Sequence, residues 1–159
     1  MGMVWVGYRR DPRTAEACLL DADRLEELLD SDDDDASVDL DKAWHGLHWL
    51  LTGSSGETAG VLSEAIFGGE PLGEDLGYGP GRLLPAAQVS LVADALKMLD
   101  IDTFRRRMDG RAMTNAEIYP SIWDENDVFD EYLVPAFTDL RRFYEQASTA
   151  GQAVIQTIC

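Results

Sequence analysis

The stretch LDKAWHGLHWLLTG, residues 40–53, carries the strongest structural signal in the sequence. Its apolar side chains recur with the spacing of one helical face, and it contains two tryptophans and both histidines of the chain. Asp39 or Asp41 can cap the first turn, and Gly53 can adopt the left-handed conformation of a helix C-cap. Because two indoles and several leucines share this segment, we predict a buried helix at the centre of the core.

Two β-prone runs lie near the ends of the sequence. They are MVWVGY at residues 3–8 and AVIQTI at residues 153–158. We predict that each run is a strand and that the two strands pair with each other, which would tie the termini together. The segment at residues 118–120 is a candidate for an additional edge strand, because a residue before proline is disfavoured in helical conformations.

Most of the remaining chain has features of helices. The predicted helices cover residues 14–20, 23–29, 61–66, 86–99, 103–108 and 125–150, the last interrupted by Pro135. A chain of 159 residues suits one core, because this length buries about 68–70% of the surface of the unfolded chain. We predict an α+β fold, a mainly helical single domain over residues 1–159 with a small sheet formed by the N-terminal and C-terminal strands.

Residues 70–84, EPLGEDLGYGPGRLL, contain four glycines and two prolines. We predict a long loop without regular structure, and loops of this kind are often functional. The glycine spacing matches neither GxGxxG nor GxxxxGK[ST], which disfavours a phosphate-binding loop. The preferred interpretation is a structural loop with a buried Tyr78 and a paired Arg82, and an anion site at Arg82 is the alternative.

The acidic run at residues 30–39 is predicted to be a solvated surface loop, because its like charges repel one another. A calcium-binding EF-hand is the alternative interpretation, with ligands at Asp30, Asp32, Asp34 and Asp41. It is disfavoured because Asp35 stands where the motif has glycine, and because the twelfth position is Asp41 and not the longer glutamate.

Five segments along the chain carry a family resemblance. They are MGMVWVGY, DKAWHGLHWLLTG, GGEPLGEDLGYGPGRLL, EIYPSIW and FYEQASTAGQAVI. Together they resemble the bacterial YfbM-like family, whose members share a domain of unknown function. The resemblance implies one compact domain with helices around a small sheet. It implies no activity, cofactor or catalytic residue, so no functional role is transferred to this chain.

The charge balance limits the classes of partner. Thirty Asp and Glu against thirteen Lys and Arg give a net charge of −17, which disfavours general nucleic-acid binding and leaves a basic protein as the expected macromolecular partner. The only dense basic cluster is Arg105, Arg106, Arg107 and Arg111. We interpret it as a solvated face or a network with carboxylates, and an anion site is the alternative. The oligomeric state is not indicated by the sequence.

The sequence features that indicate the cellular compartment agree with those that indicate the redox state of the cysteines. The sequence has neither a signal-peptide pattern nor an apolar run of the roughly 18 residues that a membrane helix needs, so we expect a cytoplasmic protein without membrane association. Cys18 and Cys159 have no disulfide or metal-site spacing and are interpreted as a core thiol and a terminal thiol.

Catalytic and metal motifs are weak. His45 and His48 are spaced to share a metal on one helical face, but no third His or Cys completes a site, so no metal or cofactor is predicted. The sequence also lacks GxSxG, and neither cysteine lies in a motif of an activated thiolate. No catalytic residue is predicted, and whether the protein is an enzyme stays open.

Two classes of function remain, and the first is slightly favoured. It is a non-catalytic binding protein, such as an inhibitor or immunity-type protein, whose acidic surface binds a basic macromolecule. The second is a small-molecule-binding protein or enzyme with a pocket between the Trp44/His48 helix and the glycine-rich loop 70–84. The residues expected to line that pocket are Trp44, His48, Tyr78, Arg82 and Tyr119, which combine a titratable ring, a cation and flat apolar walls.

Overall fold

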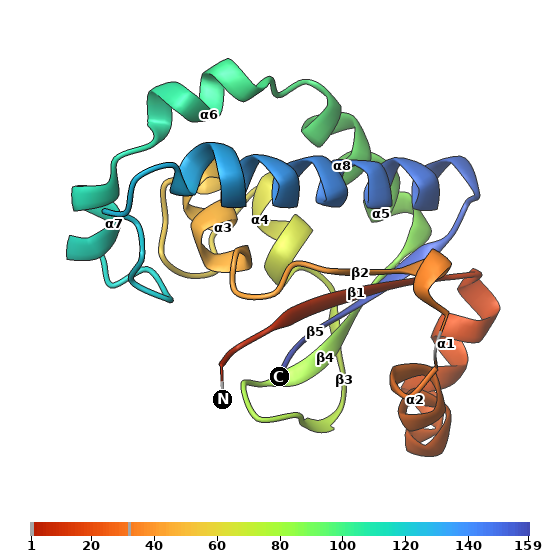
Figure 1. Ribbon diagram of the computed structural model, residues 1–159. Coiled ribbons are helices and arrows are strands. Elements are labelled where there is room, and N and C mark those ends of the chain that lie inside the picture. The colour runs from red at the N-terminus through yellow and green to blue at the C-terminus, as the bar shows by residue number, and fades with distance from the viewer. Residues whose placement is uncertain (1, 32) are drawn as a thin grey trace.

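An antiparallel sheet of five strands, in the order β2-β1-β5-β4-β3, forms one layer of the structure (Figure 1). The structure is a computed structural model that describes residues 2–31 and 33–159. The strands are β1 (Trp5–Arg10), β2 (Ser37–Asp39), β3 (Glu70–Asp75), β4 (Pro80–Leu84) and β5 (Ala153–Ile158). Helices pack against this sheet to give a single α+β domain, which confirms the predicted fold class.

The two terminal strands pair as predicted. β1 and β5 are neighbours in the sheet, with a register that runs from Trp5 opposite Ile158 to Arg10 opposite Ala153. The indole N–H of Trp5 donates to the carbonyl of Ile66, at 3.1 Å, and so connects the sheet to a helix above it. The β-branched and aromatic residues of these runs therefore form the central part of the sheet.

Residues 70–84 are a β-hairpin, so the predicted irregular loop is wrong. β3 is an edge strand in which only Leu72 is buried, and an edge position tolerates Pro71 and Gly73. The Asp75 carboxylate accepts hydrogen bonds from the backbone N–H groups of Gly77 and Gly79, at 2.6 and 3.1 Å, and so holds the turn. Pro71, Gly73, Gly77 and Gly79 thus belong to the turn and the exposed edge, whereas Pro80 and Gly81 begin β4, and none of them prevents strand pairing.

Two other segment predictions need correction. Residues 34–36 of the acidic run form a short 3-10 helix, η1, and residues 37–39 form the edge strand β2, so the run is not a continuous loop. Asp32, one position of the EF-hand interpretation, lies outside the described residues. Residues 118–120 form a turn with a cis Tyr119–Pro120 peptide and not a strand. Tyr119, which as the residue before proline is disfavoured in helical conformations, therefore lies in a turn and not in a strand.

The central helix, α3 (Trp44–Thr52), is buried as predicted but is shorter. A turn that includes Leu40 precedes it, and no side chain caps its first turn. The predicted aspartate cap is wrong because the Asp39 carboxylate accepts from the N–H of Asp41, at 2.6 Å, and stabilises that preceding turn instead. Gly53 ends the helix with φ 73°, which confirms the left-handed C-cap.

All but one of the other helices correspond to predicted helices, with shifts of a few residues at their ends. They are α1 (Pro12–Leu20), α2 (Ala22–Leu29), α4 (Val61–Phe67), α5 (Ala86–Lys97), α6 (Ile101–Arg107), α7 (Gly110–Asn115) and α8 (Val134–Thr149), the last preceded by a π-helical turn, η2 (Phe129–Leu133). α7 was not predicted, because six residues with one buried side chain, Met113, give no periodic signal. Pro135 lies in the first turn of α8, directly after the π-helical turn η2.

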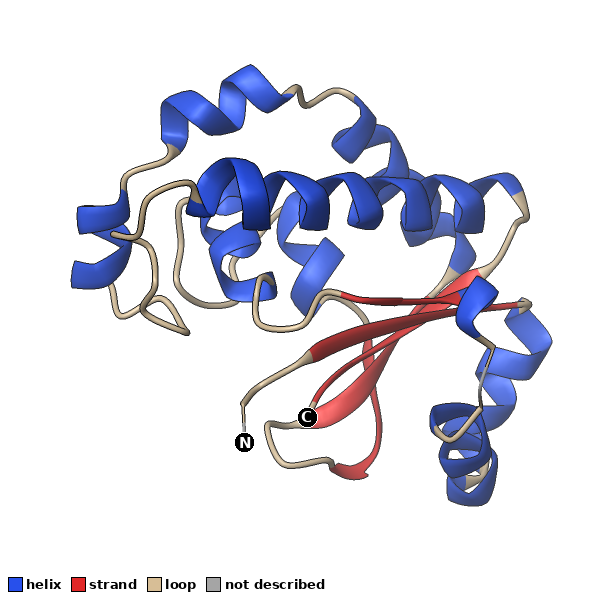
Figure 2. Ribbon diagram, in the orientation of Figure 1, coloured by secondary structure: helices blue, strands red, loops and turns tan. Residues whose placement is uncertain are grey.

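Helices cover the two faces of the sheet unequally (Figure 2). The larger apolar cluster joins one face, through Trp5 and Val154, to the helices α3, α4, α5 and α8. A smaller cluster, which includes Cys18 and Ile155, joins the opposite face to α1 and α2. None of the helices in the described residues combines the length and apolarity needed to cross a bilayer. The larger helix layer is the side of the sheet on which the candidate site lies.

Candidate functional site

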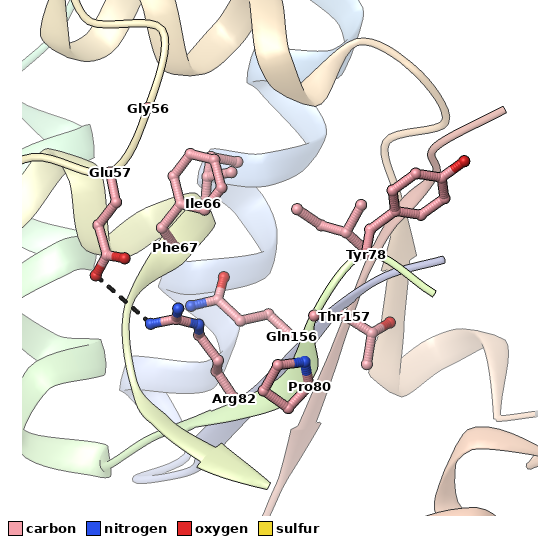
Figure 3. A pocket seen from close by; sticks show the side chains of 11 residues that line it. Gly56, Glu57, Ile66, Phe67, Tyr78, Pro80, Arg82, Gln156 and Thr157 are labelled. Carbon is pink, nitrogen blue, oxygen red and sulfur yellow. Dashed lines mark hydrogen bonds and ion pairs between the residues drawn. The ribbon is translucent and has the colours of Figure 1, made fainter. Parts of the chain in front are cut away.

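A cavity of about 230 Å³ opens where the sheet meets the end of α4 (Figure 3). Four parts of the chain form it: the loop before α4, the end of α4, the β3–β4 turn with β4, and the end of β5. Its lining residues are Gly56, Glu57, Ile66, Phe67, Tyr78, Gly79, Pro80, Arg82, Gln156, Thr157 and Ile158. We refer to it as the Arg82 cavity.

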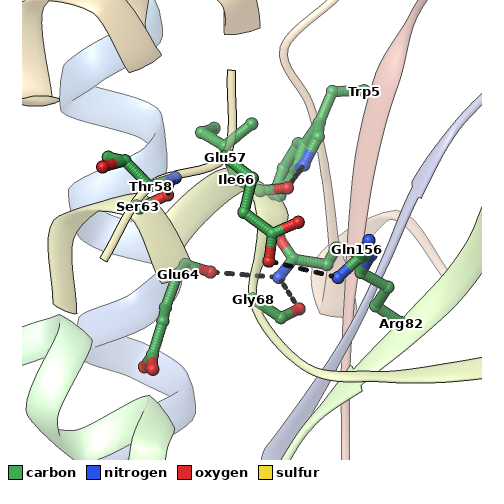
Figure 4. A network of polar contacts seen from close by, with 9 residues as sticks. All are labelled: Trp5, Glu57, Thr58, Ser63, Glu64, Ile66, Gly68, Arg82 and Gln156. Carbon is green, nitrogen blue, oxygen red and sulfur yellow. Dashed lines mark hydrogen bonds and ion pairs between the residues drawn. The ribbon is translucent and has the colours of Figure 1, made fainter. Parts of the chain in front are cut away.

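Arg82 and Gln156 lie directly opposite each other on the paired strands β4 and β5. Gln156 is only 2% exposed, although it is polar. Its amide nitrogen donates to two backbone carbonyls, those of Glu64 and Gly68, at the C-terminal end of α4 (Figure 4). These two bonds use both amide hydrogens and therefore determine which way the amide is turned.

The amide oxygen of Gln156, Oε1, is left as a buried acceptor. It has no hydrogen-bond partner among the described residues, and less than 1 Å² of its surface is exposed. Buried acceptors are nearly always paired, because an unpaired one loses its bonds to water without replacement. Arg82 is the adjacent residue on the neighbouring strand, so a donor that enters between these two side chains would complete the pairing.

Charged groups of both signs lie at the cavity. The guanidinium Nη1 of Arg82 is 3.5 Å from Oε1 of Glu57, and their side chains are 30% and 56% exposed (Figure 4). This is one long contact and not the two parallel bonds that an Arg–carboxylate pair can form. Such an exposed pair contributes little stability, so both groups can exchange it for a ligand at small cost.

The remaining walls are mostly apolar. Ile66, Phe67, Pro80 and Ile158 contribute hydrocarbon surface, and Tyr78 stands at the rim with 54% of its surface exposed. The expectation of a buried Tyr78 is therefore wrong, because the β3–β4 turn carries this residue beyond the edge of the core. The expectation that Arg82 is paired is confirmed by its contact with Glu57.

The two histidines lie beside the cavity but do not line it. His45 Nε2 is 2.6 Å from the carbonyl oxygen of Ser55, and its Nδ1 accepts from the N–H of Tyr119, at 2.9 Å. His48 is fully buried, with Nε2 2.7 Å from the carbonyl oxygen of Gly56 and Nδ1 unpaired within the described residues. Nε2 donates in both rings, and Nδ1 of His45, which accepts, carries no proton. Burial lowers the pKa of each ring below its usual range, which favours the neutral form.

The structure divides the five predicted ligand residues into two neighbouring groups. Tyr78 and Arg82 line the cavity, whereas Trp44, His48 and Tyr119 do not. Phe67 lies between the groups: it lines the cavity, and its ring makes edge-to-face contacts with His48 at 4.7 Å and Trp44 at 5.9 Å. His48 contacts the loop that lines the cavity, through the carbonyl of Gly56, whereas Trp44 and Tyr119 bind the backbone of Met3.

Sequence reasoning missed Glu57 and Gln156. Gln156 did carry a signal, because it occupies the register of Val154 and Ile158 on the inward face of an otherwise apolar strand. A polar residue at such a position needs a partner or a function. Glu57 carried none, since it is one of many acidic residues and its nearness to Arg82 depends on how the loop folds back.

A second hollow lies along the sheet edge, between η1–β2 and α8. It has a volume of about 340 Å³, and four carboxylates contribute to its lining, together with a single cation, Arg142. The carboxylates are those of Asp34, Asp35, Asp39 and Asp139. We refer to it as the acidic groove. Arg142 is 3.5 Å from Asp139, so one of the four is partly neutralised.

Metal and anion chemistry have little support in the described part of the chain. No group of three or more His, Cys, Asp or Glu side chains there is arranged to hold a metal ion. In the basic cluster, Arg105 binds both oxygens of Asp130, at 3.1 and 2.8 Å, and lowers the pKa of that carboxyl. Arg107 donates to the carbonyl of Leu50, at 2.8 Å. Of the four arginines, Arg105 pairs with a carboxylate, which agrees in part with the interpretation of a solvated face or a network with carboxylates.

Comparisons with known proteins identify a family but no activity. No curated protein matches the chain. A solved structure described as that of a protein of unknown function, YfbM from Escherichia coli, is similar, with a TM-score of 0.78 and 22% sequence identity over 99% of this chain and 100% of that one. The family model for a domain of unknown function, DUF1877, matches residues 1–157. The resemblance to the YfbM-like family is thus confirmed, and the chain belongs to the DUF1877 family.

Proposed function

We propose that this protein binds a small polar molecule in the Arg82 cavity. The observation that carries the proposal is the unpaired buried oxygen of Gln156 beside the weakly paired Arg82. The buried oxygen of Gln156 lacks a hydrogen-bond donor and lies next to a cation. This arrangement is suited to a ligand that supplies the donor. Apolar walls around a few polar groups are the usual composition of small-molecule sites.

The geometry favours binding over catalysis. Among the lining residues, the ionisable side chains are Glu57, Tyr78 and Arg82, and the lining contains no His, Cys, Ser or Lys. Neither histidine lines the cavity: Nδ1 of His45 accepts from the N–H of Tyr119, and Nδ1 of His48 is buried, so neither ring presents its basic nitrogen to a molecule in the cavity. The hydroxyl groups of the lining are those of Tyr78 and Thr157, and that of Thr157 donates to the carbonyl of Val6, at 3.5 Å, and is not paired with a base.

Thermal unfolding in the presence of a metabolite library tests this proposal. A ligand at about 100 times its Kd should stabilise the protein by roughly 2.7 kcal/mol, which raises Tm by about 5–10 °C. Arg82→Gln should abolish the shift. Arg142→Gln is the matched control, because Arg142 also makes one 3.5 Å contact with a carboxylate but lies outside this cavity. A shift that survives Arg82→Gln would place the ligand elsewhere.

Binding of a basic protein segment at the acidic groove is a second candidate function. It is supported by the four carboxylates beside β2, an edge strand whose free side can pair with an extended segment, and by the net charge of −17. Such binding would be strongly salt-dependent, because the attraction is screened over about 8–10 Å at 0.1–0.15 M salt.

Capture of partners at low and high salt tests this second function. The decisive variant is Asp34→Asn/Asp35→Asn/Asp39→Asn, and the control is Glu16→Gln/Glu26→Gln/Glu74→Gln, which removes equal charge from exposed positions outside the groove. A basic protein retained at low salt should be lost with the first variant and kept with the second. Equal loss with both variants would indicate nonspecific attraction to the net charge.

We infer a bacterial cytoplasmic location for either function. The similarity to an Escherichia coli protein supports the bacterial origin. Both cysteines are free, Cys18 buried and Cys159 exposed, as is usual for proteins of reducing compartments.

A further inference from the structure

We infer that the molecule held in the Arg82 cavity is a small zwitterion of the amino-acid type, with one carboxylate, one ammonium group and a short apolar side chain. This inference rests on the proposed small-molecule function and names the chemical class of the ligand. It follows from the set of polar groups at the cavity, from the volume of the cavity, and from the charges around it.

The polar groups define a complementary pattern. Arg82 offers N–H donors with a positive charge, Glu57 offers a negative acceptor, and Gln156 offers a neutral acceptor. The two charges are only 3.5 Å apart, so a ligand that satisfies both must carry opposite charges close together. An α-amino acid has this arrangement, because its carboxylate and ammonium groups are attached to the same carbon atom.

A zwitterion would replace one long ion pair with better contacts. Its carboxylate can accept two parallel bonds from the Arg82 guanidinium, and its ammonium group can donate to Glu57 and Gln156. Less than 1 Å² of Gln156 Oε1 is exposed, so side chains at the cavity must move before the ammonium group reaches this oxygen, and Arg82, which turns toward the ligand carboxylate, is one of them. The Arg82 side chain is 30% exposed and makes one weak contact, so this movement is inexpensive.

The volume favours a small ligand with an apolar part. The cavity of about 230 Å³ lies below the roughly 300–1,000 Å³ that is typical of sites for drug-sized molecules. Beyond the charged pair, Ile66, Phe67 and Pro80 supply apolar surface, which suits a short hydrocarbon side chain.

The charges disfavour a phosphate in the same place. A phosphate monoester carries about −1.5 to −2 charges at pH 7, whereas the lining contains one cation, and a carboxylate lies 3.5 Å from it. The whole chain adds a net charge of −17. A zwitterion adds no net charge, so it gains the attraction of Arg82 without the repulsion of Glu57.

Calorimetric titration of the full chain with the twenty common amino acids tests the inference. The expected result is binding of one or more apolar amino acids. If leucine binds, 4-methylpentanoate, which lacks the ammonium group, and 3-methylbutylamine, which lacks the carboxylate, should each bind at least tenfold more weakly. The analogues of whichever amino acid binds best serve in the same way.

Two variants assign the charges to their residues. Glu57→Gln should bring the affinities for leucine and 4-methylpentanoate together, because the ammonium group has lost its ionic partner. Arg82→Gln should abolish the binding of leucine, because the ligand carboxylate has lost its ionic partner. Glu74→Gln and Arg142→Gln, which change exposed residues outside the cavity, should preserve the original order of affinities.

The outcomes separate the ligand class from the function. Equal binding of leucine and either analogue by the wild-type chain would overturn the zwitterion and leave the cavity as a ligand site. Binding of another metabolite and of no amino acid would have the same two consequences, provided that this binding is lost in Arg82→Gln. If neither amino acids nor library compounds bind, or if binding survives Arg82→Gln, both the inference and the proposed function are wrong.

Discussion

Gln156 and His48 are two buried polar side chains in neighbouring parts of the molecule, and their surroundings differ. They are 2% and 0% exposed, and both contact backbone carbonyls next to α4: Gln156 those at its C-terminal end, His48 that of Gly56 in the preceding loop. Each also keeps one polar atom without a partner in the described structure. Gln156 lies in the wall of a cavity with Arg82 and Glu57, whereas His48 packs edge-to-face on Phe67 at 4.7 Å.

The difference shows when an unpaired buried atom indicates a ligand. At Gln156 there is space, a movable cation and an apolar wall, so a molecule can enter and supply the donor. At His48 the surroundings are close-packed, and the bare Nδ1 instead marks an imidazole held in its neutral form. The same local observation therefore points to binding in one region and to pH sensitivity in the other.

The largest effect is expected from Gln156→Leu. This change removes both amide donors, leaves the carbonyl of Gly68 unpaired in the core, and leaves that of Glu64 with only the backbone N–H of Gly68. We expect the free energy of unfolding to fall by roughly 2–5 kcal/mol, measured by urea denaturation. Gln146→Leu is the control on an exposed helix position, with an expected change within about 0.5 kcal/mol. A loss below about 1 kcal/mol for Gln156→Leu would show that the amide network is not tightly formed.

An intermediate effect is expected from acidification between pH 7.5 and 5.5. His45 and His48 have a lowered pKa in the folded protein, so the unfolded chain binds protons first, from about pH 6.5 downward. Their contribution to stability is complete above that pH and is lost as the pH falls toward the folded-state pKa. The limit is about 1.4 kcal/mol per pH unit for each ring.

His48→Gln sharpens this second test, because glutamine can still donate to the carbonyl of Gly56 but does not titrate. Urea denaturation at several pH values should give a shallower decline for this variant than for the wild-type chain. Unfolding free energies that stay level from pH 7.5 to 5.5 in the wild-type chain would contradict the assignment of neutral buried rings.

The smallest effect on stability is expected from Arg82→Gln. Its single 3.5 Å contact with Glu57 is partly exposed, so the free energy of unfolding should change by less than about 1 kcal/mol, as for Arg142→Gln. The same substitution should remove ligand binding, which would separate the binding group from the structural amide beside it. A loss of 2 kcal/mol or more would instead make Arg82 a structural residue.

Much of the fold could be predicted because its signals are local. The buried face of α3, the end of that helix at Gly53 and the two β-prone terminal runs are each encoded within a few consecutive residues. The hairpin at residues 70–84 was missed, since β3 contributes one buried side chain and Pro71 and Gly73 oppose its strand character. Pairing with β4 outweighs that local preference, and such pairing cannot be deduced from the sequence of one segment.

The site was less predictable than the fold because it is built from distant parts of the chain. Arg82 and Gln156 become neighbours through the register of β4 and β5, and Glu57 joins them through the loop before α4. Tyr78 and Arg82 could be predicted because they lie in a glycine-rich stretch, which is typical of a functional loop. Trp44, His48 and Tyr119 have side chains typical of a ligand site, but in the structure they lie outside the cavity. There the rings of Trp44 and His48 pack against Phe67, and Tyr119 packs against Trp44.

Strand β5 pairs on one side with β1 and on the other with β4, so its insertion closes a loop that spans nearly the whole sequence. Contacts of such long range are slow to form, because the entropy of loop closure is lost before they contribute. Until β5 is in place, β1–β2 and β3–β4 are separate two-stranded ribbons, which are marginal in water. Arg82 and Gln156 thus meet only when folding is complete. A molecule bound between them would slow global unfolding, because it would stabilise the strand pairing that forms last.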